Sequence, residues 1–322
     1  MRVISVIDTS ICDYNLGNHI IMEAVYNVLN ELFPQDFFVK LQYLEKYGKF
    51  SKRYMKISDL IFFGGTNSLS SEMNKYSQMG FSLLDLIYAK NKLVLLSVGW
   101  WQYQPLPNLY TRILLKNLLH KDYFHIVRDS YTAEMLRKVG ILNVYNGSCV
   151  TTWNLTPEHC AQIPHVKSEN VVITLTDYNK SPSDDFRLLE ILVKHYKKVY
   201  IWIQGLGDMN YFKELIKDLR EKEKNRIIVI PPKLYAYDEI LANVELDYIG
   251  TRLHGGIRAL QFKKRTLIIG IDNRAIEMHK DINLNVVKRG DTQSVINFIE
   301  GKYITELNIP FDVINKWKAQ FK

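Results

Sequence analysis

Short apolar runs alternate along the chain with longer segments in which apolar residues recur at helical spacing. Strands buried in a parallel sheet are nearly continuous apolar runs, whereas helices that cover a sheet repeat with the helical period. The runs that predict strands are 3–7, 60–63, 93–98, 124–127, 143–150, 171–174, 199–203, 227–230, 246–249 and 266–269. The segments that predict helices are 20–32, 131–139, 185–195, 211–221, 237–242, 292–300 and 311–321. This alternation predicts an α/β fold.

The pattern breaks at residues 156–170, which hold two prolines and no sustained period and are expected to form a linker. A chain of 322 residues is long enough for two domains. We therefore expect two Rossmann-like, doubly wound parallel-sheet domains facing a cleft, over residues 1–160 and 161–322. The closing helix at 311–321 is expected to pack back on the first domain.

Composition narrows the class of protein. Hydrophobic residues make up 47% and charged residues 24%, as in a globular protein. The net charge of +8, from 42 basic and 34 acidic residues, favours anionic partners. The charge is spread along the chain rather than blocked, so nucleic acid is not expected as a partner. Three cysteines without metal or redox spacing fit a reduced, cytoplasmic compartment, and contact with the inner membrane surface is left open.

Polar loops follow most of the predicted strands. In doubly wound sheets ligands bind outside the carboxyl ends of the strands, so residues in these loops are expected to line the cleft. They are Asn15, Gly17, Asn18, Gly65, Thr66, Asn67, Trp100, Arg128, Gln204, Arg274 and Glu277. Helix caps, plain turns, a core tryptophan or a surface ion pair of Arg128 would explain the same residues, and the pattern alone leaves these alternatives open.

The segment 249–262 carries the densest chemistry in the chain. It follows an apolar run, reads Ile-Gly-Thr-Arg-Leu-His-Gly-Gly-Ile-Arg-Ala-Leu-Gln-Phe, and continues with helical spacing. A helix N-terminus favours anions, and Arg252, His254 and Arg258 suit a small dianion that must also exchange a proton. Gly255 and Gly256 would let the backbone approach a ligand closely. A capped helix with a tight turn is the simpler alternative.

Five short motifs together give the chain a resemblance to the polysaccharide pyruvyl transferase family. The motifs are Asn15-Leu16-Gly17-Asn18, Gly64-Gly65-Thr66-Asn67, Ser97-Val98-Gly99, Val127-Arg128-Asp129-Ser130 and Arg252-Leu253-His254-Gly255. The resemblance implies a fold similar to GT-B glycosyltransferases and transfer of a pyruvyl group from phosphoenolpyruvate. The implied acceptor is a sugar of a cell-surface polysaccharide or its lipid-linked precursor, and the product is a ketal on two hydroxyls. Many members have an acidic residue where this chain has Asn18.

The resemblance and the chemistry of the donor together suggest residue roles. Phosphoenolpyruvate carries a phosphate and a carboxylate, which Arg252, Arg128 and Arg258 are expected to hold together with Gly255 and Gly256. His254 is expected to transfer protons during ketal formation. The first domain is expected to hold the acceptor, and no metal or cofactor is expected. Two alternatives are glycosyl transfer from a nucleotide sugar and a non-catalytic carbohydrate-binding or assembly role.

Overall fold

A computed structural model describes residues 1–44 and 46–322, and the chain divides into two compact units. Unit 1 consists of Met1–Asp13, Ile21–Trp153 and Ile309–Lys322, and unit 2 of Tyr14–Ile20 and Asn154–Asn308. The chain therefore passes from unit 1 to unit 2 after Trp153, before the domain boundary that the sequence predicted. The reason is that helix α6 (Pro157–Cys160) is tied to unit 2, where the His159 ring bonds the carbonyl of Leu260 at 2.8 Å.

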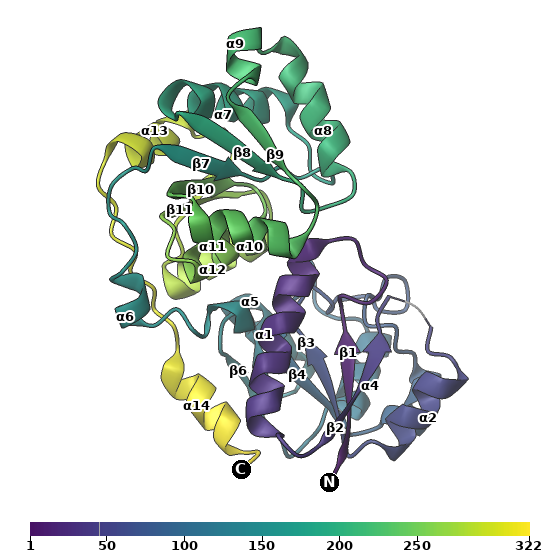
Figure 1. Cartoon of the computed structure of the whole chain (residues 1–322). Helices are drawn as coiled ribbons and strands as arrows, with labels where there is room; N and C mark the ends of the chain where they lie inside the picture. Colours follow the sequence, from purple (N-terminus) through teal and green to yellow (C-terminus); the bar gives the residue numbers. More distant parts are fainter. Residues whose placement is uncertain (45) are drawn as a thin grey trace. The chain divides into compact units, whose positions relative to one another are not determined.

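Unit 1 contains a six-stranded, all-parallel sheet (Figure 1). The strand order is β2-β1-β3-β4-β5-β6. The strands are β1 (Val3–Asp8), β2 (Phe37–Gln42), β3 (Leu60–Gly64), β4 (Leu93–Val98), β5 (His125–Val127) and β6 (Val144–Asn146). The helices are α1 (Leu16–Leu32), α2 (Lys49–Ile57), α3 (Leu86–Ala89), α4 (Leu109–Leu118), α5 (Ser130–Val139) and α14 (Phe311–Ala319), with short 3-10 turns η1 (Leu83–Asp85) and η2 (Val150–Thr152).

Neighbouring residues of β3 face opposite sides of the sheet and build two separate cores in unit 1. Phe63 packs in the cluster under α2 to α5. Phe62 meets Phe33 at the end of α1, with ring centroids 5.7 Å apart. It also meets Trp317 of α14 at 6.4 Å and Phe321 at 5.6 Å. The last helix of the chain therefore completes the core of the first unit.

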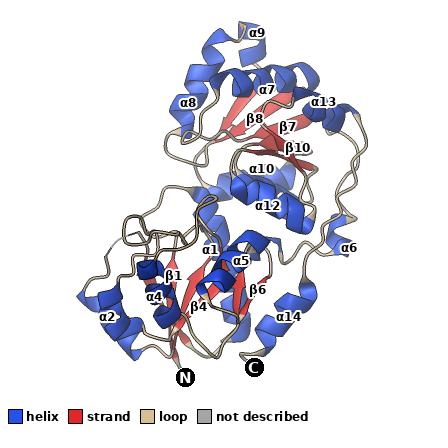
Figure 2. Cartoon of the chain, turned by 180° about the vertical axis from the view of Figure 1, so that it is seen from behind, coloured by secondary structure: helices blue, strands red, loops and turns tan. Residues whose placement is uncertain are grey.

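Unit 2 repeats the architecture with the strand order β12-β11-β10-β7-β8-β9 (Figure 2). The strands are β7 (Asn170–Ile173), β8 (Lys198–Trp202), β9 (Ile227–Ile230), β10 (Leu246–Gly250), β11 (Thr266–Gly270) and β12 (Val286–Lys288). The helices are α7 (Pro182–His195), α8 (Asp208–Leu215), η3 (Ile216–Asp218), α9 (Glu221–Lys224), α10 (Leu234–Asn243), α11 (Leu253–Gln261), α12 (Asn273–Ile282) and α13 (Thr292–Glu300). The expectation of two Rossmann-like parallel-sheet domains is confirmed.

Several local predictions were wrong or incomplete. Arg274 and Glu277, expected in a loop, lie in α12, which Asp272 caps by accepting from the Arg274 amide. Residues 156–170 include helix α6, because Pro157 occupies the first turn, where a missing N–H costs nothing. Strand β2 was not predicted, since it lies at the sheet edge and its burial does not alternate. Throughout the described residues, no helix is long and apolar enough to cross a membrane.

His125 is a fully buried histidine at the start of β5. Its Nδ1 accepts a hydrogen bond from the Leu95 amide at 3.2 Å, and its Nε2 lies 3.0 Å from the carbonyl oxygen of His120. This pair of contacts fits a neutral ring with the proton on Nε2. Burial lowers the pKa of His125 to about 4, although the His120 carbonyl acts in the opposite direction.

The low pKa of His125 predicts acid sensitivity. The folded pKa lies below the unfolded value near 6.5, so the stabilisation is complete above that pH and is lost as pH falls from about 6.5 to about 4. We expect the free energy of unfolding to drop by about 3 kcal/mol over this window. Urea unfolding at a series of pH values measures it. His125→Asn should flatten the dependence and the exposed control His165→Gln should not; equal slopes in all three proteins would contradict the prediction.

Candidate functional site

Three of the motif segments meet around Arg128 at the carboxyl ends of β3, β4 and β5. The Arg128 side chain is buried, with 1% exposure. Its Nη2 donates to Asn67 Oδ1 and, at 3.1 Å, to Asp129 Oδ2. The other oxygen of Asp129 caps α5 by accepting from the Thr132 amide at 2.8 Å. The loop after β3 and the start of α5 are therefore joined through one guanidinium.

Gly99 and a bulge in β4 make room for this guanidinium. A Cβ at Gly99 would lie 2.4 Å from Arg128 Cζ, so no larger residue fits unless the arginine moves. Two residues earlier, Ser97 has a φ of 59°, and the register with β5 shifts between Leu96 and Val98. The sequence motif around Gly99 thus has a packing reason.

The loop after β3 holds two consecutive residues in the left-handed region. Gly65 has a φ of 62° and Thr66 a φ of 55°. The conformation is easy for glycine, but it costs a β-branched threonine about 1–3 kcal/mol. Hydrogen bonds hold it: the Gly65 amide donates to Leu96 O at 2.7 Å, and the Gly99 amide donates to Thr66 O at 2.8 Å. This strained loop places the Asn67 side chain within hydrogen-bond distance of Arg128.

Arg128 keeps hydrogen-bonding capacity to spare. Its Nε and Nη1 are buried and have no partner among residues 1–44 and 46–322. A buried cation with unused donors is costly, and a carboxylate or phosphate oxygen would satisfy it. Because these nitrogens have almost no exposed surface, an anion reaches them only if a neighbouring loop moves. The strained segment at Gly65 and Thr66 is adjacent in unit 1.

Trp100 does not line a cleft, contrary to the prediction from sequence. Its ring is fully buried in the core cluster under α2 to α5. The indole Nε1 donates to Gln104 Oε1 at 3.0 Å, and the Trp100 amide donates to Thr132 Oγ1 at 2.8 Å. A ring with no exposed face cannot stack on a sugar, so Trp100 is a core residue.

In unit 2, Arg252 lies between β10 and α11, where it is the N-cap residue. It is buried, and its Nη2 donates to Asp177 Oδ1 at 2.9 Å and also forms an ion pair with Asp208. Its Nε donates to the carbonyl of Leu175 at 3.1 Å, and its guanidinium lies 4.9 Å from the ring centroid of Tyr178. Two carboxylates therefore offset the positive charge that was expected to attract the donor.

Two opposing effects act on the pKa of Asp208, which forms a buried ion pair with Arg252. Burial raises the pKa of Asp208, and the guanidinium of Arg252 acts in the opposite direction. Arg252 is also held from its backbone, since its carbonyl accepts a hydrogen bond from Tyr248 Oη at 2.6 Å. The start of α11 is thus anchored by both the side chain and the main chain of Arg252.

His254 is the second residue of α11 and is buried. The two glycines after it belong to the same helix and have no positive φ. A Cβ at Gly256 would lie 2.8 Å from both Ile268 Cγ1 and Tyr248 Cε1. The carbonyl of Gly255 accepts from Tyr237 Oη at 2.9 Å. The prediction that Gly256 lets the backbone approach a ligand is therefore wrong. Gly256 instead lets α11 pack closely on the sheet.

The first polar loop of the chain belongs to unit 2, not to the N-terminal domain as expected. Gln204 Nε2 donates to Asn15 Oδ1 at 3.1 Å, and the Leu16 amide donates to Gln204 O at 3.0 Å. A Cβ at Gly17 would lie 2.7 Å from Gln204 Nε2, so a larger residue there would displace the Gln204 side chain. Asn18 is buried one residue further on. Two predicted site segments far apart in sequence therefore meet.

Gln204 also presents an unused acceptor. Its Oε1 is buried and unpaired within the described part of the chain. The Cβ position of Gly255 lies 3.1 Å from this oxygen, so the oxygen is beside the first turn of α11. A hydroxyl group is the kind of donor that an amide oxygen accepts. Gln204 is therefore suited to hold a ligand hydroxyl next to the segment that carries His254.

The remaining predicted residues of unit 2 are engaged in contacts with other protein side chains. Arg258 Nε and Nη2 donate to the two oxygens of Asp238 at 2.8 and 2.7 Å, which joins α11 to α10. Arg274 Nη2 donates to Tyr178 Oη at 2.6 Å. Glu277 forms an ion pair with Lys280 at 2.7 Å. The structure thus gives Arg258 a role in holding two helices together.

Sequence reasoning missed the residues that hold Arg252 in place. Asp177, Asp208 and Tyr178 were not singled out, although Asp208 closes the polar loop after β8. A buried arginine implies acidic partners somewhere. The sequence carries no signal that tells which of its acidic residues they are, because the partners lie far from Arg252 along the chain.

Fold and motifs together define the class of protein. Two Rossmann-like units with parallel sheets and polar loops at the strand ends constitute a GT-B-like fold. The family model described as polysaccharide pyruvyl transferase matches residues 15–273. The chain therefore belongs to the polysaccharide pyruvyl transferase family, which is a family of transferases. Among curated proteins, no sequence matches significantly.

Solved structures with a similar fold include two UDP-N-acetylglucosamine 2-epimerases and S. aureus MnaA. The UDP-GlcNAc 2-epimerase of Methanocaldococcus jannaschii, in complex with UDP-GlcNAc and UDP, is 12% identical, with 98% of this chain and 99% of that chain covered and a TM-score of 0.58. S. aureus MnaA with UDP is 11% identical, with 100% of this chain and 98% of that chain covered and a TM-score of 0.57. The UDP-N-acetylglucosamine 2-epimerase of Rickettsia bellii is 12% identical, with 99% of this chain and 94% of that chain covered and a TM-score of 0.54. Identities this low establish the fold, not the activity.

The spare donors of Arg128 predict anion binding. Arg128→Met should bind inorganic phosphate at least about tenfold more weakly than the wild type, because charge-assisted hydrogen bonds are lost. Isothermal titration calorimetry measures the affinity. Arg53→Met, which removes an exposed arginine of the same unit, is the matched control and should bind as the wild type does. Equal affinity in all three proteins would show that Arg128 is only a structural link.

Proposed function

We propose that the protein transfers a pyruvyl group from phosphoenolpyruvate to two hydroxyls of one sugar in a cell-surface polysaccharide or its lipid-linked precursor. Both hydroxyl oxygens form bonds to carbon 2 of the pyruvyl group, and the bond from that carbon to the phosphate oxygen breaks. One hydroxyl proton ends on the methylene carbon, which becomes a methyl group, and the other leaves with the phosphate. The product is a pyruvate ketal, and no oxidant or reductant is consumed.

Family membership is the observation that carries this proposal. The matched residues 15–273 include all five motif segments. The segments of unit 2 lie at the carboxyl ends of parallel strands, where ligands of such sheets bind. The unused acceptor at Gln204 supports a ligand rich in hydroxyl groups. The similar structures support the fold alone, so glycosyl transfer from a nucleotide sugar gains no separate support from them.

The geometry of unit 2 suggests different roles for the two central residues. His254, in the first turn of α11, is the group we assign to proton transfer, because an imidazole can accept and donate protons near neutral pH. Arg252 acts as a positioning residue, since Asp177 and Asp208 already offset its charge. Arg128 in unit 1 stays a separate prediction as an anion contact.

The activity is tested by incubating the purified chain with phosphoenolpyruvate and candidate saccharide acceptors. We expect release of inorganic phosphate that depends on the acceptor, together with an acceptor whose mass has increased by one pyruvyl ketal. Phosphate assays and mass spectrometry measure the two products. Parallel incubations with UDP-sugars provide the control donor. Sugar transfer from a UDP-sugar, without reaction of phosphoenolpyruvate, would replace this function with glycosyl transfer.

His254→Gln and His254→Ala are expected to lower turnover at least about a hundredfold, because proton transfer by a positioned side chain contributes about 10²–10⁴ in rate. Binding of phosphoenolpyruvate should weaken little. Turnover and calorimetric affinity are measured on the same preparations. His165→Gln, at an exposed histidine of unit 2, should match the wild type in both. Joint loss of binding and turnover would instead identify His254 as a phosphate contact, and turnover within a few-fold of wild type would remove it from the mechanism.

A further inference from the structure

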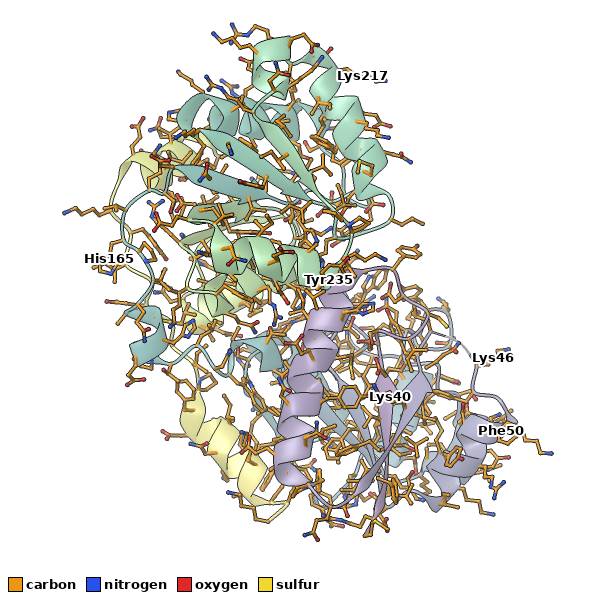
Figure 3. All side chains as sticks on the ribbon, in the orientation of Figure 1. Lys40, Lys46, Phe50, His165, Lys217 and Tyr235 are labelled. Atoms are coloured by element: carbon orange, nitrogen blue, oxygen red, sulfur yellow. The ribbon has the colours of Figure 1, made fainter. Side chains whose placement is uncertain are left out.

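Helix α2 of unit 1 has two apolar sides, and only one of them packs in the core. Met55 is fully buried in the core cluster. Phe50, Tyr54 and Ile57 recur at spacings of four and three residues, so they share another face of the helix. Phe50 is 71% exposed, and Figure 3 shows it on the outer side of the helix. The helix therefore turns a stripe of large apolar side chains to water.

Basic residues lie beside this apolar stripe. Lys49, Arg53 and Lys56 are exposed, and no acidic side chain within residues 1–44 and 46–322 pairs with them. Only Lys52 turns inward, to Asp85 at 3.2 Å. On a helical projection the three exposed cations occupy the arc next to Phe50 and Ile57. Apolar and cationic halves thus divide the solvent side of one short helix.

Large exposed apolar side chains also lie on the three helical segments that follow, η1, α3 and α4. Leu84 of η1 and Ile87 of α3 are 75% and 74% exposed, and Leu109 of α4 is 73% exposed. Helix α3 contacts both α2 and α4, so the three helices that carry these side chains lie next to one another in unit 1. We call this surface the α2–α4 face. It consists of Phe50, Tyr54, Ile57, Leu84, Ile87, Leu109 and Ile113, with Lys49, Arg53, Lys56, Lys90 and Lys116 among them.

Acidic residues are nearly missing from these segments. Over α2, η1, α3 and α4 the one acidic residue is Asp85, which is buried and paired with Lys52. Contiguous exposed apolar surface of this kind marks an interaction site. A second copy of the chain would bring one basic face against another, and like charges placed together oppose association. The charge pattern therefore requires a partner that is negative and apolar at the same time.

We infer that the α2–α4 face docks on a membrane surface that contains anionic phospholipid. Phe50, Ile57, Leu84 and Ile87 would enter the boundary between headgroups and acyl chains, as the apolar side of an interfacial helix does. The exposed lysines and Arg53 would lie at the level of the lipid phosphates. The net charge of +8 adds long-range attraction to such a surface. This inference does not rest on the proposed transferase activity.

Vesicle flotation tests the inference with the full chain. The wild type should float with vesicles of mixed phosphatidylcholine and phosphatidylglycerol and stay behind with phosphatidylcholine alone. The triple variant Lys49→Glu/Arg53→Glu/Lys56→Glu should lower the partition coefficient by at least about a hundredfold. The double variant Phe50→Ser/Ile57→Ser should lower it by at least about tenfold. All these side chains are exposed, so melting temperatures should stay at the wild-type value.

The matched control is Lys213→Glu/Lys217→Glu/Lys222→Glu, which makes the same change in net charge on exposed residues of unit 2. It should keep most of the binding. Equal losses in both triple variants would show general attraction by net charge and overturn the docking face. Absence of flotation with anionic vesicles would also overturn it. So would a wild-type dimer in analytical ultracentrifugation that Phe50→Ser/Ile57→Ser converts to a monomer, since the face would then bind a second copy.

Discussion

The polar end of unit 2 depends on the buried charge of Arg252. A buried guanidinium without a counter-charge would destabilise the fold by several kcal/mol, so Asp177 and Asp208 must lie within reach of it. Asp177 lies in the loop after β7, Asp208 is the first residue of α8, and Arg252 itself joins β10 to α11. The ion pairs of Arg252 thus hold the carboxyl ends of three strands together. They also hold the start of α11, which carries His254. Arg128 in unit 1 has a single carboxylate partner and unused donors, so the same residue type leaves room for an external anion there.

The fold could be predicted largely from the sequence because most of its strands are central and buried on both faces. Such strands are uninterrupted apolar runs, and the central strand β4 was predicted to the residue. Some of the elements that escaped prediction lie at the edges of the sheets. Strands β2 and β12 are edge strands with exposed positions, and α2 carries apolar residues on two sides, which blurs its period. The assignment of residues 14–20 to unit 2 depends on contacts with Gln204 that no local pattern encodes.

The positions of the motif residues could be predicted from the sequence, but their hydrogen-bond and ion-pair partners could not. Motif residues were expected at strand ends, and the structure places them there, gathered around Arg128 in one unit and Arg252 in the other. What a residue does there depends on partners far along the chain. Arg258 was expected to hold a ligand and instead holds Asp238, while Trp100 turned out to be core. Charge and aromaticity can be read from sequence, whereas the satisfaction of a charge or the burial of a ring is set by tertiary contacts.

The return of α14 to unit 1 has a consequence for the order in which the chain can fold during synthesis. When the ribosome has released residues 1–153, every strand of the first sheet is available, yet Phe62 lacks the aromatic cover of Trp317 and Phe321. That cover emerges only after all of unit 2 has been made. The second unit can therefore complete its core before the first does. In the meantime the nascent first unit exposes an apolar sheet face, which makes it the part of the chain most in need of chaperone protection.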